Sequence, residues 1–502
     1  MRVSFGPPPS MYTQSALSAD GRRKKRRRNQ LLGLAAIVVV AVLAVVGVVL
    51  LRDDSAPAGN DKPQSVAQGR LDVRETVEKK PASTTGVMDF RFSTDGLAPG
   101  EHEDLPGMWA TDKILAKGVK NTLAGLRIGT DASPGDEAWK LRLSGLICGY
   151  TRHVTVDGRT AVLSRSRAND ETAPCDHLTF VDLDSGQKIW EHQFAVSQIG
   201  GGQDTPSVTL AHATVAVSWG GGAEAYDMDS GKLLWRSKAP DRCRDTGVAG
   251  GRALLDRLSC ANPGTNSTSW ESVTYKVREL DPRTGRVAWT YAVAPGVRDV
   301  RVPSTDPAVL ATAAGETGYT ELLSLDAHGK VRATIRLQSG TYVGECSDEV
   351  DLVVLDDCPT IAVGAGQAFV RSKEAEGLHT SNWIIGFDLA TGNTVKKYES
   401  GPNALLYPIR MSGDQLLALR LGQDHISPSA LVSLDPRTGA ETPYLYFSVA
   451  SEAEALTVLD ASDVVVQNGR LFFGSHSVDG PSGKQKQWTW MVLGIGSLAA
   501  KH

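Results

Sequence analysis

The residues of this chain best suited to chemistry are its acidic clusters, and one kind recurs. The stretches DLDSG at 182–186 and DMDSG at 227–231 resemble the opening of a calcium-binding loop. A helix–loop–helix calcium site needs a bidentate Glu at its twelfth position, where this chain has Gln193 and Lys238. The same phrase also returns without its second Asp, as LDPRTG, so a repeated turn explains it better than a metal site does.

A second acidic cluster lies between two cysteines, in the stretch CSDEVDLVVLDDC at 346–358. Its carboxylates are Asp348, Glu349, Asp351, Asp356 and Asp357. One interpretation is a cation-binding or partner-facing loop closed by a disulfide. The alternative is an acidic, solvated hairpin.

Other catalytic and metal-binding patterns are missing from the sequence. No cysteine stands in a CxxC pair, which disfavours zinc and thioredoxin-like chemistry. The ten histidines show no HExxH or comparable ligand spacing, and no motif of a hydrolase nucleophile is found. We therefore name no catalytic residue and no metal ligand.

The elements that would position any site carry a repeated phrase, Asp-x-x-x-Gly, which is one residue shorter in one copy. The phrase begins at Asp131, Asp182, Asp227, Asp281, Asp326, Asp388 and Asp435, and it reaches Gly135, Gly186, Gly231, Gly285, Gly329, Gly392 and Gly439. Four residues after the glycine, the first four copies have Trp139, Trp190, Trp235 and Trp289. The last three have Ala333, Lys396 and Pro443 there.

The chemistry of this phrase is structural. An apolar strand runs into Asp, whose carboxylate can cap the backbone amides of a tight turn. Gly provides a positive φ at little steric cost. The Trp on the departing strand offers a large flat surface that can pack against the next repeat.

The copies are spaced by about 51 residues on average, which is typical of a β-propeller with several strands in each repeat. Short β-rich runs with turn residues between them, and no long amphipathic helices, agree with an all-β fold. The region 88–502 has room for about eight four-stranded antiparallel blades at this spacing, and seven remain possible because the repeat lengths vary. We expect the eighth blade to close the ring by pairing 86–93 with 488–497.

The phrase resembles the tryptophan-docking repeat of the PQQ-like, or quinoprotein-like, β-propellers. Enzymes of that family hold PQQ with a calcium ion, ligated by an acidic residue, an Asn and a catalytic Asp, and many carry a disulfide between adjacent cysteines. This chain has no Cys-Cys pair, and no local motif matches that ligand set, so no catalytic residue is carried over. The resemblance therefore implies the fold and makes PQQ with calcium an alternative only.

The N-terminal region predicts a membrane anchor. Residues 31–51 are uninterrupted apolar residues that rise about 32 Å as a helix, enough to span a bilayer. The run RRKKRRR at 22–28 places residues 1–30 in the cytoplasm as a disordered basic tail, and the chain after 52 outside. A cleaved signal peptide is the alternative, but this apolar core is longer than usual. The polar residues 52–87 are expected to be a flexible linker.

Six cysteines agree with an exterior location, since disulfides persist in oxidising compartments. Fifteen connectivities are possible. Sequential pairing is favoured because each pair would lie within one repeat, joining Cys148 to Cys175, Cys243 to Cys260 and Cys346 to Cys358.

Together these features predict a single-pass plasma-membrane protein that presents an extracellular propeller. We expect a non-enzymatic binding, scaffold or sensor module of a bacterial cell envelope. Its partners would be an envelope or membrane protein or an extracellular ligand, and not a nucleic acid, since the basic run flanks a span. The alternative is a PQQ- and calcium-dependent quinoprotein dehydrogenase or cofactor-binding protein.

Overall fold

The computed structural model describes residues 68–498, apart from positions 95, 129–134, 169, 196–197, 200–201, 204, 263–271, 315–317, 338–340, 347–353, 376–378, 425 and 482–487. The predicted cytoplasmic tail at 1–30, the predicted span at 31–51 and residues 52–67 lie outside the described residues. Among the residues that are described, no helix is long and apolar enough to cross a membrane.

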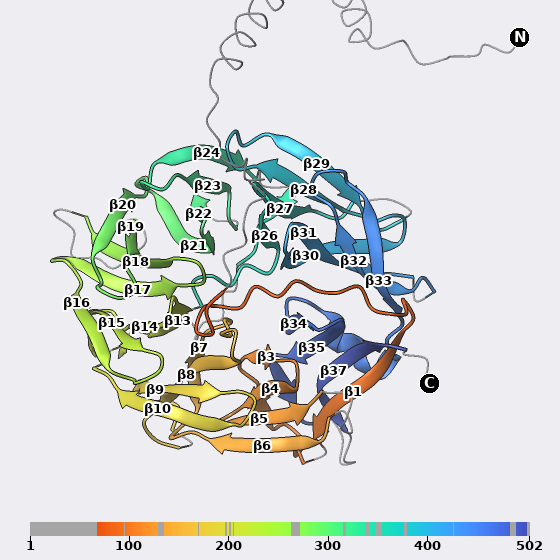
Figure 1. Ribbon diagram of the computed structural model, residues 1–502, viewed down its shortest axis with the longest axis horizontal. Helices are drawn as coiled ribbons and strands as arrows, with labels where there is room; N and C mark the ends of the chain where they lie inside the picture. Colours follow the sequence, from red (N-terminus) through yellow and green to blue (C-terminus); the bar gives the residue numbers. More distant parts are fainter. Residues whose placement is uncertain are drawn as a thin grey trace, which may run out of the picture. The chain divides into compact units, whose positions relative to one another are not determined.

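The described residues form a ring of eight antiparallel blades around a central axis (Figure 1). Blade 1 contains β3 (Met108–Ala110), β4 (Ile114–Val119), β5 (Thr122–Arg127) and β6 (Glu137–Arg142). Blade 2 contains β7 (Ile147–Tyr150), β8 (Arg159–Arg165), β9 (Cys175–Asp182) and β10 (Gln187–Gln193). Blade 3 contains β13 (Ser207–Ala211), β14 (Thr214–Ser218), β15 (Gly222–Asp227) and β16 (Leu233–Lys238). Blade 4 contains β17 (Cys243–Ala249), β18 (Leu254–Ala261), β19 (Val273–Leu280) and β20 (Val287–Ala292).

The ring continues with blade 5, which contains β21 (Val297–Thr305), β22 (Ala308–Ala314), β23 (Glu321–Leu325) and β24 (Val331–Arg336). Blade 6 contains β25 (Tyr342–Val343), β26 (Ile361–Gly364), β27 (Gln367–Ser372), β28 (Trp383–Asp388) and β29 (Thr394–Glu399). Both β25 and β26 pair with β27. Blade 7 contains β30 (Ala404–Ser412), β31 (Gln415–Gly422), β32 (Ser429–Leu434) and β33 (Glu441–Phe447). Short pairs outside the blades join β2 (His102–Asp104) to β36 (Ser477–Asp479) and β11 (Gln198–Ile199) to β12 (Gly202–Gln203), and η2 (Ser451–Thr457) is a 3₁₀ helix.

Blade 8 is built from both ends of the described chain. Its strands are β34 (Ser462–Gln467), β35 (Arg470–Ser475), β37 (Thr489–Ser497) and, outermost, β1 (Gly86–Thr94). Strand β1 pairs antiparallel with β37 along its whole length, from Gly86 opposite Ser497 to Thr94 opposite Thr489. This confirms both the eight-bladed propeller and the closure of the ring by its two ends.

The burial of the strands explains why the blades stack. All residues of β13 and β14 are buried, because the inner strands contact a neighbouring blade on each face. In the outer strand β16 only Trp235 is buried and the other residues are half-buried or exposed, as expected where one face is solvated. Each blade therefore contributes to a core that continues around the ring.

The repeated phrase forms the turn between the third and fourth strands of a blade. In blade 3, Oδ1 of Asp227 accepts hydrogen bonds from the backbone N–H of Ser230 at 2.9 Å and from its hydroxyl at 2.8 Å. Gly231 closes the turn with a φ of +66°, a conformation that a Cβ would strain. Asp131 lies outside the described residues, whereas the other six aspartates of the phrase lie in such turns.

Each docking tryptophan packs on the glycine of the following blade. A Cβ built on Gly186 of blade 2 would lie 2.3 Å from Cδ2 of Trp139 in blade 1, so only glycine leaves room for the indole. The Trp139 Nε1–H donates to the carbonyl of Leu183 in that same turn, at 3.0 Å. The same contact to the next turn is made by Trp190 with Met228 and by Trp235 with Pro282.

The repeats without tryptophan use other side chains at the same junctions. Between blades 6 and 7, the Lys396 ammonium donates to the Arg437 carbonyl at 3.0 Å, and the Tyr398 hydroxyl donates to the Asp435 carbonyl at 3.0 Å. Ala333 of blade 5 lies beside Gly392 of blade 6. The junctions thus keep their geometry although the residue types change.

All three disulfides join consecutive cysteines, as the sequence favoured: Cys148 with Cys175, Cys243 with Cys260 and Cys346 with Cys358. The first lies within blade 2 and the second joins β17 to β18 of blade 4. The third closes the acidic stretch that precedes β26.

The prediction of a flexible linker over 52–87 does not hold for its described part. Residues 68–85, called here the axial segment, cross the centre of the ring on one side (orange-red in Figure 1). Val73 pairs with Thr155, and Thr85 pairs with Tyr446 on the other side of the ring. The polar side chains of this segment form hydrogen bonds and ion pairs with the ring. Composition alone does not distinguish such a segment from a solvated tether.

Candidate functional site

The two faces of the ring differ in what they carry. One face holds the hairpins between the first and second strands of each blade, together with the Asp–Gly turns, and we call it the hairpin face. The axial segment contacts this face, since the Ala213 N–H donates to Leu71 and the Glu78 N–H donates to the Ser412 hydroxyl. The opposite face holds the connections between blades and is called the loop face.

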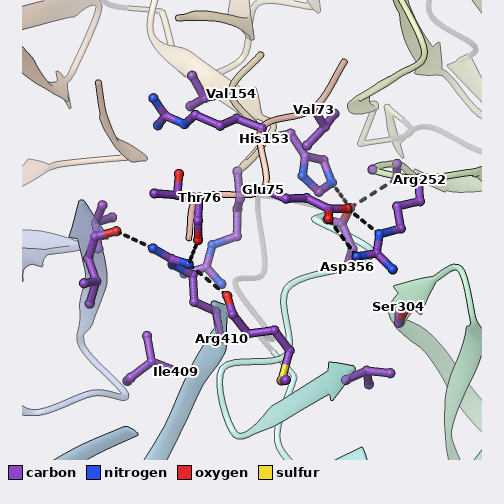
Figure 2. Close-up of a pocket in the computed structure, with 18 of the residues that line it drawn as sticks. Val73, Glu75, Thr76, His153, Val154, Arg252, Ser304, Asp356, Ile409 and Arg410 are labelled. Atoms are coloured by element: carbon purple, nitrogen blue, oxygen red, sulfur yellow. Dashed lines mark hydrogen bonds and ion pairs between the residues drawn. The ribbon is translucent and has the colours of Figure 1, made fainter. Parts of the chain in front are cut away.

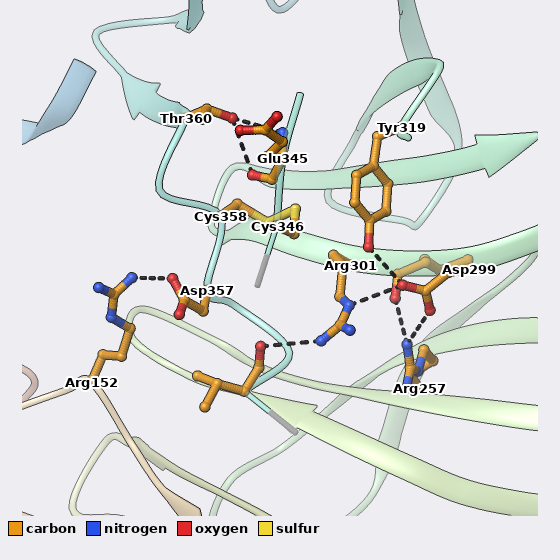
Figure 3. The surroundings of a disulfide bond; sticks show 12 residues. Arg152, Arg257, Asp299, Arg301, Tyr319, Glu345, Cys346, Asp357, Cys358 and Thr360 are labelled. Atoms are coloured by element: carbon orange, nitrogen blue, oxygen red, sulfur yellow. Dashed lines mark hydrogen bonds and ion pairs between the residues drawn. A yellow bond between two sulfur atoms is a disulfide. The ribbon is translucent and has the colours of Figure 1, made fainter. Parts of the chain in front are cut away.

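The disulfide between Cys346 and Cys358 lies near Asp357, whose carboxylate faces Arg152 (Figure 3). Val354 and Leu355 are buried, and the Val302 N–H donates to the Leu355 carbonyl at 3.0 Å. Asp348, Glu349 and Asp351 lie outside the described residues. Asp357 is buried, Asp356 is 11% exposed, and both are paired with basic groups, so the expectation of a solvated hairpin is wrong for these two residues.

A cluster of buried charges occupies the axis beside this loop. Asp463 on β34 lies 3.5 Å from Nζ of Lys117 on β4, 3.4 Å from Nη2 of Arg152 and 3.4 Å from Nε2 of His476. The Arg152 guanidinium also binds the Asp357 carboxylate. Lys117, Arg152, Asp357, Asp463 and His476 together are called the axial ion cluster.

The charges of the axial ion cluster depend on one another. Burial opposes ionisation of Asp463, but the hydrogen bond to His476 and the charges of Lys117 and Arg152 outweigh it and hold its pKa well below the ordinary range. Lys117 is 0% exposed and donates to the Leu105 carbonyl at 2.6 Å, so its ammonium is held without water. Removing one member would leave an uncompensated buried charge.

A second pair lies next to the cluster. His153 Nε2 is 2.8 Å from Oδ2 of Asp356, which also accepts the Gly250 N–H at 3.2 Å. Burial raises the pKa of Asp356, but His153 and the backbone bond lower it more, and the net pKa is below the usual value. Asp356 and Asp357 are thus both bound by other groups of the protein.

A cavity of about 500 Å³ opens at the axis on the hairpin face, and Figure 2 shows its lining. Its walls are the ends of the innermost strands and of the connections that follow them, and residues 73–77 of the axial segment form part of its boundary. We call it the axial cavity.

Ion pairs fix the axial segment over this cavity. Arg252 Nη2 donates to Oε2 of Glu75 at 2.7 Å. Arg410 Nη2 donates to Oε1 of Glu78 at 2.6 Å, and Arg410 Nη1 donates to the Thr76 carbonyl at 2.8 Å. The Gly469 N–H donates to the second oxygen of Glu78 at 2.8 Å. Glu78 is buried, so this contact is firmly built into the fold.

The axial residues do not fit a quinone with calcium. The carboxylates of Asp356, Asp357 and Asp463 are each paired with a basic side chain, which leaves none of them free as a calcium ligand. Among the described residues, no group of three or more His, Cys, Asp or Glu side chains is arranged to hold a metal ion.

In the two described turns with the sequence DLDSG and DMDSG, the aspartates bind other groups of the protein. Oδ1 of Asp182 accepts from Ser185 of its own turn, whereas Asp184 accepts from the Thr111 hydroxyl at 2.6 Å. In the next copy, Asp229 pairs with Arg70 of the axial segment at 2.5 Å and with Arg159 at 3.0 Å. The two aspartates of DLDSG and of DMDSG therefore serve different neighbours, which agrees with the interpretation as turns.

The loop face of blades 7 and 8 carries exposed apolar side chains. Ile426, between β31 and β32, is 87% exposed, and Trp488, just before β37, is 68% exposed. Val458, between η2 and β34, is 52% exposed. A second cavity of about 440 Å³ opens on this face and is lined by Tyr407, Leu459 and other residues of blades 6 to 8.

Sequence reasoning missed most of these residues. Lys117, Arg152 and Asp463 stand on different blades and far apart in the sequence, so no local spacing could have brought them together. The one available signal was Asp356-Asp357, an acidic pair that directly follows an apolar run.

Comparison with known proteins supports the fold. A family model described as "Outer membrane protein assembly factor BamB" matches residues 106–246, 176–408 and 273–496. No curated protein matches the chain significantly.

The chain is also similar to several solved structures. BamB from Moraxella catarrhalis is 13% identical, with a TM-score of 0.40, over 82% of this chain and 98% of that one. A europium-containing methanol dehydrogenase is 12% identical, with a TM-score of 0.45, over 74% and 83%. The quinohemoprotein alcohol dehydrogenase from Comamonas testosteroni is 11% identical, with a TM-score of 0.45, over 85% and 79%.

The family model spans most of the propeller, the docking residues lie at the junctions between blades, and the ring has eight blades. The chain belongs to the PQQ-like β-propeller family whose model is described as an outer-membrane assembly factor.

Proposed function

We propose that this protein is a membrane-anchored, extracytoplasmic propeller that acts as a non-enzymatic binding and scaffold module of the cell envelope. Residues 31–51 would anchor it in the plasma membrane, with the basic tail in the cytoplasm and the propeller outside. The description of the matching family model as an assembly factor supports a role in holding other proteins.

The observation that carries the proposal is the group of apolar side chains on the loop face. Ile426, Val458 and Trp488 belong to connections of neighbouring blades and are largely exposed. These side chains come from two neighbouring blades and share one face, and exposed apolar surface of this kind can mark a site of protein contact. The hairpin face is crossed by the axial segment, whereas these three side chains all lie on the loop face. We therefore place the partner on the loop face.

The alternative is a quinoprotein dehydrogenase that holds PQQ with calcium. The paired state of Asp356, Asp357 and Asp463 counts against it, because a calcium ion would have to compete with Arg152, His153 and Lys117 for the axial carboxylates. Its ligands would then have to come from elsewhere in the ring.

Photo-crosslinking in intact cells tests the scaffold proposal. A photoreactive residue is placed at Ile426 or Val458 on the loop face, and at Val287 on the outer edge of blade 4 as the matched control. We expect one dominant membrane-protein adduct from the loop-face positions and none from Val287. Equal labelling from all three positions would contradict a specific loop-face contact.

Calorimetric titration with PQQ, with and without calcium, tests the alternative on the same full-length protein. Stoichiometric binding that requires calcium would favour a quinoprotein and overturn the proposal. Binding that does not require calcium would not do so, because PQQ carries carboxylates that any basic cavity can attract.

A further inference from the structure

The axial cavity has a lining rich in charged side chains. Its basic residues are Arg74, Arg152, Arg252 and Arg410, with His153, and its carboxylates are Glu75, Asp306 and Asp356. Apolar side chains, among them Met108, Ile409 and Val464, complete the wall. The volume of about 500 Å³ falls within the usual range for small-molecule sites, about 300–1,000 Å³.

Most of the guanidinium groups at this cavity have carboxylate partners. Arg152 pairs with Asp357, Arg252 with Glu75, and Arg410 with Glu78. Asp306 is exposed to water at the rim. The pairing accounts for three of the four arginines.

Arg74 is the exception. Its guanidinium donates to the Ala110 carbonyl, and within the described part of the chain no ion pair joins it to a carboxylate. Burial lowers the pKa of Arg74, and the charge of Arg410 lowers it further, whereas the charges of Asp112, Glu78 and Asp184 raise it. A guanidinium does not give up its proton at physiological pH, so Arg74 stays charged in the cavity without a carboxylate of the described residues bound directly to it.

The neighbouring guanidinium is already fixed in place. Arg410 donates to the carbonyls of Thr76, Met411 and Val466 at 2.8, 2.8 and 2.9 Å, besides binding Glu78. Its position therefore does not depend on a ligand. Arg74 is held by its hydrogen bond to the Ala110 carbonyl and binds no carboxylate of the described chain directly, so an anion could bind it with little loss of side-chain entropy.

We propose that the axial cavity binds a small organic molecule through a carboxylate or phosphate group held by the guanidinium of Arg74. Guanidinium forks bind both groups in a bidentate manner, which is stronger and more specific than a contact with a single ammonium. The carbon part of the ligand lies against Met108 and Ile409. This proposal is independent of a protein partner on the opposite face.

Calorimetric titration of the full-length protein in detergent provides the test. Citrate and inorganic phosphate are the probes, and sodium chloride at matched ionic strength is the control. We expect saturable one-to-one binding of at least one probe, and comparison of the two arms decides between a carboxylate and a phosphate ligand. Absence of saturable binding by both probes would overturn the proposal.

Two variants tie the binding to the cavity. Arg74→Gln removes the charge and should weaken binding at least tenfold. Arg437→Gln removes a charge from an exposed turn on the same face, 75% exposed, and should leave the affinity unchanged. Equal weakening in both variants would mean diffuse attraction by the surface, and an unchanged affinity in Arg74→Gln would place the ligand elsewhere.

A third variant keeps the test valid if Arg74→Gln loosens the axial segment. Arg74→Lys retains the charge and a donor for the Ala110 carbonyl but lacks the planar fork. We expect an affinity between those of the wild type and Arg74→Gln, with a urea midpoint equal to that of the wild type. If Arg74→Lys and Arg74→Gln both bind the probe with the affinity of the wild type, the proposed role of Arg74 is refuted.

Discussion

The close contact between tryptophan and glycine predicts a specific cost for one methyl group. In Gly186→Ala, the new Cβ would lie 2.3 Å from Cδ2 and 2.5 Å from Cγ of Trp139, well inside van der Waals contact. The indole cannot yield freely, because its Nε1–H donates to the Leu183 carbonyl of the same turn. The backbone at Gly186 also has a φ of +70°, which alanine adopts only with strain.

The expected loss of stability in Gly186→Ala has two parts. A left-handed backbone costs a residue with a Cβ about 1–2 kcal/mol. Forcing a methyl group into a filled space costs a further 1–3 kcal/mol or so. Gly366→Ala is the matched control, because Gly366 has a φ of +74° and a Cβ there would meet nothing within 4 Å. We expect Gly186→Ala to be less stable than Gly366→Ala by about 1–3 kcal/mol, the cost of the overlap alone.

Urea unfolding of the purified protein, followed by far-UV circular dichroism and by tryptophan fluorescence, measures the difference. A double-mutant cycle with Trp139→Leu then tests its cause, because removal of the indole should leave Gly186→Ala with the backbone cost only. If Gly186→Ala costs no more than Gly366→Ala, or if its cost persists in the Trp139→Leu background, the account of tryptophan docking is refuted.

Three further predictions concern buried charge and the disulfide. Asp463→Asn should destabilise the protein by about 3–5 kcal/mol near pH 7, because the buried ammonium of Lys117 loses its counter-charge. The folded pKa of Asp463 lies well below its unfolded value of about 3.9, so this contribution is fully present above that value and shrinks as the pH falls below it. The difference in stability between the two proteins, measured by urea unfolding, should therefore be smaller at pH 3 than at pH 7, and an unchanged difference would contradict this account. Asp245 should behave in the opposite way, because its pKa is raised by burial and then by the charge of the nearby Asp256. Its contribution to the stability of the protein should fall as the pH rises above about 3.9, so Asp245→Asn should be more stable than the wild type at pH 7. Equal stability of the two proteins at pH 7 would contradict this reasoning. Replacing Cys346 and Cys358 by alanine should cost about 3 kcal/mol through the loss of a short closed loop, measured as a lower urea midpoint without reductant, where the other two disulfides stay intact.

The sequence predicted the parts of the fold that are written locally. Asp227, Gly231 and Trp235 lie within one hairpin, and their roles follow from side-chain capping, positive φ and aromatic area. The closure of the ring could also be predicted from the sequence. The strand at 489–497 had no outer strand following it, and the strand at 86–94 could pair with it. The number of blades stayed open between seven and eight because the spacing of the repeats is uneven.

The axis of the ring could not be predicted in the same way. Lys117 stands in the run ILAKGV, where its charge gives no sign that the side chain is fully buried. Its partner Asp463 comes from the last blade, so the pairing depends on the closure of the whole ring. The prediction for the axial segment was wrong for a related reason. In the sequence, Glu75 and Glu78 look like residues of a solvated linker. Only the fold shows that they face Arg252 and Arg410.

The pairing of β1 with β37 also determines when the protein can finish folding. During synthesis, β1 emerges first among the described strands and its partner emerges last, so the outer strand of blade 8 waits for nearly the entire chain. A product truncated before residue 489 would expose an unpaired edge on β35 and another on β1, together with the apolar side chains between them. Incomplete chains therefore display the surface by which chaperones and proteases recognise unfinished proteins, and only the full-length product conceals it.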